Sequence, residues 1–180
     1  PAFLDSLSDP TPLHLAMARV VKAKLPDDVI SSNRPGVLRT IAISPNAPIG
    51  LRLEAAERAE SAGALAVDSL RQIYSSISFS EQDLANPLSR AETEGGPMTR
   101  ALLYHTSLIQ TVPTAQAEVV ARALALGREE GRYESVVRVF MPVLKRIPPS
   151  AELVWFAPEA VRALLLRGDT LDAEAWFALM

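Results

Sequence analysis

The chain has 180 residues, of which 48% are apolar, enough for one domain with a substantial core. Its formal net charge of −3 provides no basic surface for a phosphate backbone, so we expect no nucleic-acid partner. The chain has no cysteine, which excludes disulfides, thiolate catalysis and Cys-ligated zinc.

The first expected element is an amphipathic helix that begins after Pro12 and ends at Pro26. Prolines and glycines then divide residues 25–50 into short pieces. The apolar residues around Ile41 allow one short helix there, although the local alternation also fits an extended segment. We therefore predict that residues 1–50 form an N-terminal helix and a Pro-rich connecting region.

From Leu51 onward, apolar residues recur at helical spacing. Gly63 supplies a stop between the first two helices of this region. Ser80 and Asp83 form a capping-box pattern that starts the next pair, and Asn86 before a proline predicts a kink or a restart of that helix. The pattern predicts one continuous domain of helical hairpins over residues 51–78, 80–111, 114–147 and 150–180.

The third hairpin is expected to start with Thr114 as its N-cap and to turn at Gly131. Pro142 falls inside its second helix and should bend the axis. The fourth hairpin turns at Gly168, and Asp169 is the expected cap of its last helix.

The turn glycines repeat with a nearly constant period. Their separations are 33, 35 and 37 residues, and helical repeats of this size stack because a single pair cannot bury its apolar face alone. The predicted fold class is therefore all-α, an array of about eight to ten helices arranged as antiparallel hairpins in an α-solenoid. The four glycines are Gly63, Gly96, Gly131 and Gly168.

Residues 114–180 resemble degenerate tetratricopeptide repeats. The resemblance implies a scaffold that binds a protein or peptide partner along a groove and has no chemistry of its own. The matching positions of the third repeat are Gly131, Tyr133, Val136, Phe140, Val143 and Pro148, and those of the fourth are Gly168, Ala173 and Phe177.

Arginine is the first candidate for partner binding. Four arginines lie on the first helices of the pairs, and in-register stacking would align them in a ladder that grips carboxylates. Their offsets from the turn glycines differ, which favours an ordinary solvated face. The four residues are Arg58, Arg90, Arg122 and Arg162.

The second candidate surface is the aromatic C-terminus. Both tryptophans of the chain, Trp155 and Trp176, lie there with two phenylalanines and Met180, and tryptophan is enriched at binding hot spots. The interpretation we favour is that these rings form the core of the last pair or pack against a further repeat.

No residue pattern indicates catalysis or a cofactor. His105 lies on an apolar stripe without a histidine or glutamate one helical turn away, so we expect a core residue and no metal ligand. The paired carboxylates fall at helix starts and turns, where acidic residues complement the helix dipole or stay solvated. Glycine-rich phosphate loops and serine-hydrolase motifs are absent from the sequence.

The chain begins at Pro1 and ends at Met180 within an apolar pattern, so we expect a piece of a longer protein with further repeats. No apolar run reaches the roughly 20 residues that cross a bilayer. The sequence favours a non-catalytic interaction or scaffolding segment, and it leaves open whether the compartment is cytoplasm or periplasm. The alternative is a helical accessory domain of a larger enzyme, such as a cell-wall-processing protein, with its catalytic residues elsewhere.

Overall fold

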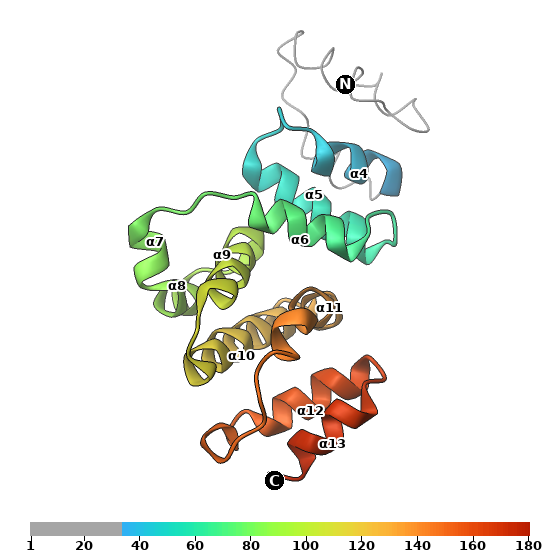
Figure 1. Ribbon diagram of the computed structural model, residues 1–180. Coiled ribbons are helices and arrows are strands. Elements are labelled where there is room, and N and C mark those ends of the chain that lie inside the picture. The colour runs from blue at the N-terminus through green and yellow to red at the C-terminus, as the bar shows by residue number, and fades with distance from the viewer. Residues whose placement is uncertain (1–33) are drawn as a thin grey trace, which may run out of the picture. The chain divides into compact units, whose positions relative to one another are not determined.

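Every regular element in the computed structural model, which describes residues 34–180, is a helix (Figure 1). This confirms the prediction of an all-α fold, while the solenoid arrangement stays a prediction. The amphipathic helix expected before Pro26 lies outside the described residues. The ten α-helices and one 3-10 helix are α4 (Pro35–Ile43), α5 (Ile49–Ser61), α6 (Val67–Ser75), α7 (Glu81–Ala85), α8 (Pro87–Thr93), α9 (Gly96–Ile109), α10 (Pro113–Glu129), α11 (Tyr133–Leu144), η1 (Ala151–Leu153), α12 (Ala157–Leu166) and α13 (Thr170–Phe177).

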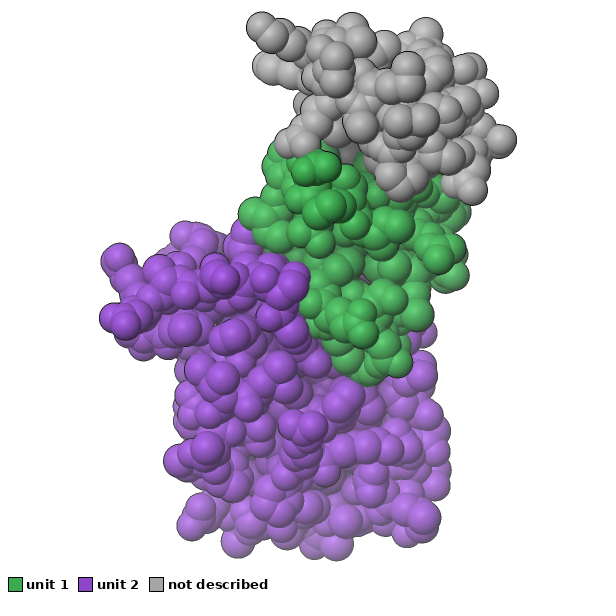
Figure 2. Space-filling view, turned by 45° about the horizontal axis from the view of Figure 1, so that its top comes forward, with its two compact units in different colours: residues 1–73 green, residues 74–180 purple. Residues whose placement is uncertain are grey.

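The chain divides into two compact units, residues 1–73 and residues 74–180, which Figure 2 shows in green and purple. In the first unit α4 packs along α5, and both helices bury apolar faces. Arg52 of α5 donates a hydrogen bond from Nε to the carbonyl of Ala42, near the C-terminus of α4, at 3.3 Å. Residues on both sides of position 50 therefore pack together within the first unit.

The four periodic glycines all have a positive φ, between 67° and 86°. Three of them follow the end of a helix, where a left-handed residue allows the chain to turn back. At Gly131, for example, the next residue's N–H returns to the Gly127 carbonyl at 2.6 Å. Gly96 differs because it opens α9. The glycine period therefore correctly marks the turns between helices.

In the second unit, consecutive helices from α8 to α13 pack on one another. Aromatic rings lie in this core. Tyr104 of α9 meets Phe140 of α11 edge-on, with ring centroids 5.4 Å apart. Phe156 and Trp176 meet in the same way at 5.5 Å, and this contact joins the start of α12 to the end of α13.

Local signals predict some helix ends and miss others. The capping box at Ser80 and Asp83 is confirmed, and so is the restart at Asn86, which separates α7 from α8. Thr114 is not an N-cap, because α10 begins one residue earlier at Pro113, whose fixed φ suits the first helical position. Asp169 occupies the N-cap position of α13 without capping it, and its carboxylate binds Lys145 Nζ at 2.9 Å instead.

Gly127 is a point of close contact between α10 and α11. A Cβ atom at Gly127 would lie 2.7 Å from Cγ2 and 3.0 Å from Cβ of Val136, a side chain with little rotational freedom. The same atom would lie 3.5 Å from the Cα of Tyr133. The two helices therefore approach more closely than any larger residue at position 127 allows.

This contact predicts that Gly127→Ala destabilises the protein. Alanine normally stabilises a helix by about 1 kcal/mol relative to glycine, but overpacking against Val136 outweighs that gain and leaves a net loss of about 1–3 kcal/mol. Gly50→Ala in α5 is the control, since no atom lies within 4 Å of its Cβ position, and it should be neutral or stabilising. Urea unfolding of both variants measures the difference; equal effects would disprove the close packing.

Candidate binding surface and polar pocket

The four candidate arginines each bind a partner within their own unit. Arg58, in the first unit, pairs with Glu54 one helical turn earlier at 2.6 Å. Arg162 on α12 lies 3.8 Å from Glu159 and is the most exposed of the four, with 59% of its side chain accessible.

The other two arginines both involve α8: Arg90 lies on this helix, and Arg122 binds to it from α10. Arg122 reaches from α10 and donates a hydrogen bond from one terminal nitrogen to the carbonyl of Ala91 in α8, at 2.5 Å. Its other terminal nitrogen pairs with Glu129 at 3.0 Å. The bond to Ala91 joins α10 to the last turn of α8, so Arg122 stabilises the packing of these two helices.

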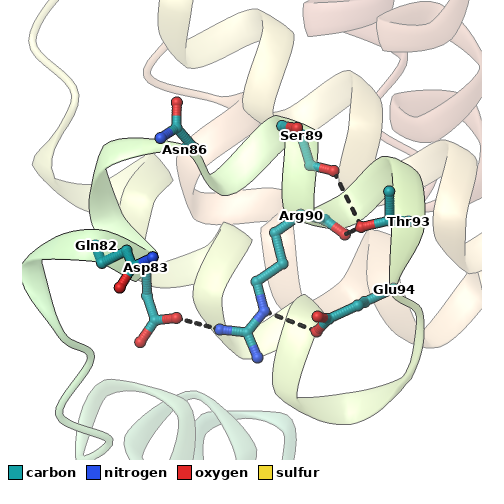
Figure 3. Close-up of a pocket in the computed structure, with 7 residues that line it drawn as sticks. All are labelled: Gln82, Asp83, Asn86, Ser89, Arg90, Thr93 and Glu94. Carbon is teal, nitrogen blue, oxygen red and sulfur yellow. Dashed lines mark hydrogen bonds and ion pairs between the residues drawn. The ribbon is translucent and has the colours of Figure 1, made fainter.

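Arg90 lies in an open polar pocket of about 490 Å³ formed by α7, α8 and the residues that follow them (Figure 3). Its guanidinium bridges two carboxylates, with Nε 2.8 Å from Glu94 and one terminal nitrogen against Asp83. Hydrogen bonds from Ser80, and then the charge of Arg90, hold the pKa of Asp83 below its ordinary value. The pocket is lined by Gln82, Asp83, Asn86, Ser89, Arg90, Thr93 and Glu94.

The chemistry of this pocket is that of an ion cluster in which one guanidinium lies between two carboxylates. Arg90 is compensated by both acids, and Glu94 raises the pKa of its guanidinium, so the cation stays charged. The lowered pKa of Asp83 keeps its carboxylate ionised near neutral pH. The pocket offers hydrogen-bonding groups to a polar ligand.

A buried ion pair at the start of α9 was not anticipated from the sequence. Arg100 is only 2% exposed, and its guanidinium pairs with the carboxylate of Glu130 at the end of α10. The other oxygen of Glu130 accepts a hydrogen bond from the backbone N–H of Gly96 at 2.6 Å, at the positive end of the α9 dipole. Glu130 therefore fixes the N-terminus of α9 against the end of α10.

A second cluster joins the α10–α11 turn to α12. Tyr133 donates its hydroxyl hydrogen to Glu159 Oε1 at 2.7 Å, and Arg128 binds Oε2 of the same carboxylate at 2.5 Å. The guanidinium of Arg128 also lies over the Tyr133 ring, 5.2 Å from its centroid. Burial, followed by the hydrogen bond to Glu159, raises the pKa of Tyr133 to about 12.

The raised pKa of Tyr133 predicts an alkaline loss of stability. Because the folded state holds this proton more tightly than an unfolded tyrosine with a pKa near 10, the stabilisation is complete below about pH 10 and disappears as the pH rises towards 12. Urea unfolding across this range should therefore show a steeper decline for the wild type than for Tyr133→Phe. Identical pH profiles would contradict the assignment.

The two tryptophans lie in opposite environments. Trp176 is 2% exposed and packs against Phe156, so it belongs to the core of the last pair. Trp155 is 49% exposed, and its ring contacts that of Phe156, with 5.6 Å between the centroids. Of the two rings, Trp155 is the one that a partner can reach directly.

Exposed apolar side chains are concentrated around this last pair. The pair α10–α11 exposes none of its large apolar side chains, whereas the segment from η1 to Met180 exposes seven. Exposed apolar side chains that gather on a protein surface mark interaction sites, and these seven are the candidates for such a site. We call this set the terminal apolar surface: Val154, Trp155, Leu165, Leu166, Leu171, Phe177 and Met180.

His105 takes part in packing. Its ring meets that of Phe79 edge-on, with centroids 5.8 Å apart. Within residues 34–180, no group of three or more histidine and acidic side chains is arranged to hold a metal ion. The same part of the chain contains no helix whose length and apolarity would carry it across a bilayer.

Comparison of the chain with protein families, curated proteins and solved structures finds no match. The terminal apolar surface and the polar pocket are therefore interpreted from their own chemistry.

Proposed function

We propose that this chain is a protein-interaction segment whose docking site is the terminal apolar surface. The observation that carries the proposal is that seven of the exposed large apolar side chains of residues 34–180 lie between Val154 and Met180, whereas helices α10 and α11 themselves expose none. Burying such side chains against a partner is favourable at about 25 cal/mol per Å². The polar clusters instead join the helices that support this surface.

The candidate residues differ in how they would contribute to this docking site. Trp155 remains a candidate contact, whereas Trp176 supports the surface from beneath. Arg162 lies on α12 at the margin of the surface and is well exposed, so it suits a polar rim. Arg122 is held by Ala91 and Glu129 and acts within the fold.

The test is quantitative affinity capture from a cell lysate with three versions of the chain. Leu165→Glu/Leu171→Glu places two charges on residues that are 53% and 80% exposed, so the fold tolerates them. Ile109→Glu introduces the same charge at a 54% exposed site at the end of α9. We expect specific partners to be lost with the double variant and kept with the control. Partners kept by both variants would refute this docking site.

A further inference from the structure

The terminal apolar surface requires an occupant, and the fold indicates what kind. Within the second unit, α11 packs against α12, and α10 contacts η1, so the preceding helical pair is covered by the hairpin that follows it. The last pair has α11 on one side and its seven exposed apolar residues elsewhere. An occupant shaped like a helical hairpin would complete the packing that α10–α11 already has.

The charges on the two helices differ in sign. On α12 and its C-cap, the exposed charges are Arg162 and Arg167, whereas the acidic Glu159 is tied to Arg128 and Tyr133. On α13 the charges are Asp172, which lies 3.5 Å from Lys145 Nζ, and the exposed Glu174, and the helix has no basic residue. Within residues 34–180, neither Arg167 nor Glu174 has an ion-pair partner. The surface therefore carries an unpaired positive charge, Arg167, beside α12 and an unpaired negative charge, Glu174, on α13.

This arrangement is complementary to itself. A two-fold axis would place α12 of one copy against α13 of the other twice over, so that both contacts bring a basic helix to an acidic one. The alternative in which α13 faces α13 would bring Glu174 of one copy close to Glu174 of the other, whereas Asp172 is held by Lys145. When α12 of each copy faces α13 of the other, leucines from both helices would pack in the middle of the interface: Leu165 and Leu166 on α12 and Leu171 on α13.

We infer that the occupant is a second copy of this chain, docked through an isologous four-helix contact in which α12 of each copy faces α13 of the other. The inference rests on the proposed function, because it names the partner of the same surface. In the dimer, the leucines and Trp155 form the apolar centre, and Arg167 faces the acidic side of the opposite α13. Stable interfaces of this type involve about 20–30 residues on each side.

Sedimentation equilibrium over a range of protein concentrations tests the dimer. The wild-type chain should show twice the 19.5 kDa mass of one chain, and Leu165→Glu/Leu171→Glu should shift the mass to that of a single chain. Ile109→Glu should remain dimeric, and circular dichroism should show the same helicity for all three. A wild-type mass of one chain at every concentration, or a dimer unaffected by the double variant, would overturn the inference.

The charge pattern supplies an independent test of the arrangement. Arg167→Glu alone and Glu174→Arg alone should each weaken self-association, because like charges then face each other across both contacts. Mixing the two variants should restore a complex of two chains, since every acid again faces a base. Failure of the mixture to associate, with both variants folded, would overturn the facing of α12 and α13.

The outcomes also separate this inference from the proposed function. A chain that is monomeric but captures a partner through the terminal apolar surface would refute the second copy and preserve the interaction segment. A chain that neither self-associates nor captures a partner in a manner sensitive to Leu165→Glu/Leu171→Glu would refute both.

Discussion

Glu130→Ala should destabilise the protein by about 3–5 kcal/mol, because it removes the carboxylate paired with the buried guanidinium of Arg100. Breaking such a pair costs far more than losing an exposed one, since the remaining charge stays in a poorly solvated site. The variant also removes the acceptor for the Gly96 N–H at the start of α9. Urea unfolding followed by circular dichroism measures the loss.

The neighbouring residue provides a matched control. Glu129 pairs with Arg122 at 3.0 Å, but 57% of its side chain is exposed, so Glu129→Ala should change the free energy of unfolding by less than about 1 kcal/mol. Two adjacent glutamates at the same helix end should thus differ severalfold in effect. Similar losses for both variants would show that Glu130 does not anchor the buried guanidinium of Arg100.

Trp176→Ala should cost about 3–5 kcal/mol, because it empties the space that the ring fills against Phe156 in the core of the last pair. Trp155→Ala removes a ring that is 49% exposed and should cost much less. In binding assays with folded variants, Trp155→Ala should reduce the affinity for the partner more than Trp176→Ala does. Chemical unfolding and affinity measurement on both variants provide the comparison, and equal stability losses would contradict the assigned burial.

This pair of variants matters for interpreting the C-terminal aromatic cluster. Loss of a partner with Trp176→Ala can arise from unfolding of α12–α13, whereas loss with Trp155→Ala reports on the surface itself. The helical content of each variant must therefore be measured beside its affinity.

The features predicted correctly from the sequence are those set by local chemistry. Gly63, Gly131 and Gly168 adopt the left-handed conformation that ends a helix, and the capping box at Ser80 needs only the residue three positions later. The helical spacing of apolar residues depends on short segments in the same way. These signals suffice for helix positions and for the all-α class.

The features that were missed depend on distant residues. Glu130 binds groups about 30 positions earlier in the chain, and no local pattern marks such a partner. The only sequence signal is an arginine, Arg100, among buried apolar residues of α9. Likewise, the close approach at Gly127 depends on Val136 across a turn, so a glycine within a helix is its only trace.

For the candidate binding residues too, local sequence predicts some features and tertiary packing decides the others. Both tryptophans lie near the C-terminus of the sequence, but sequence reasoning could not separate exposed Trp155 from buried Trp176. Tertiary packing makes that distinction, since Trp176 faces Phe156 inside the pair. Among the arginines, Arg90 and Arg162 pair with Glu94 and Glu159 within one helical turn, whereas the bond of Arg122 to Ala91 depends on tertiary packing.

Hydroxyl-radical footprinting of the bound and unbound chain tests the central claim, that the terminal apolar surface is the docking site, most directly. Trp155, Phe177 and Met180 are exposed, readily oxidised side chains on this surface, and Ile109 at the end of α9 is the exposed reference. The account predicts that binding protects the three surface residues and leaves Ile109 and the pocket residues around Arg90 unchanged. Protection of the pocket, with Trp155, Phe177 and Met180 oxidised as in the free chain, would contradict it.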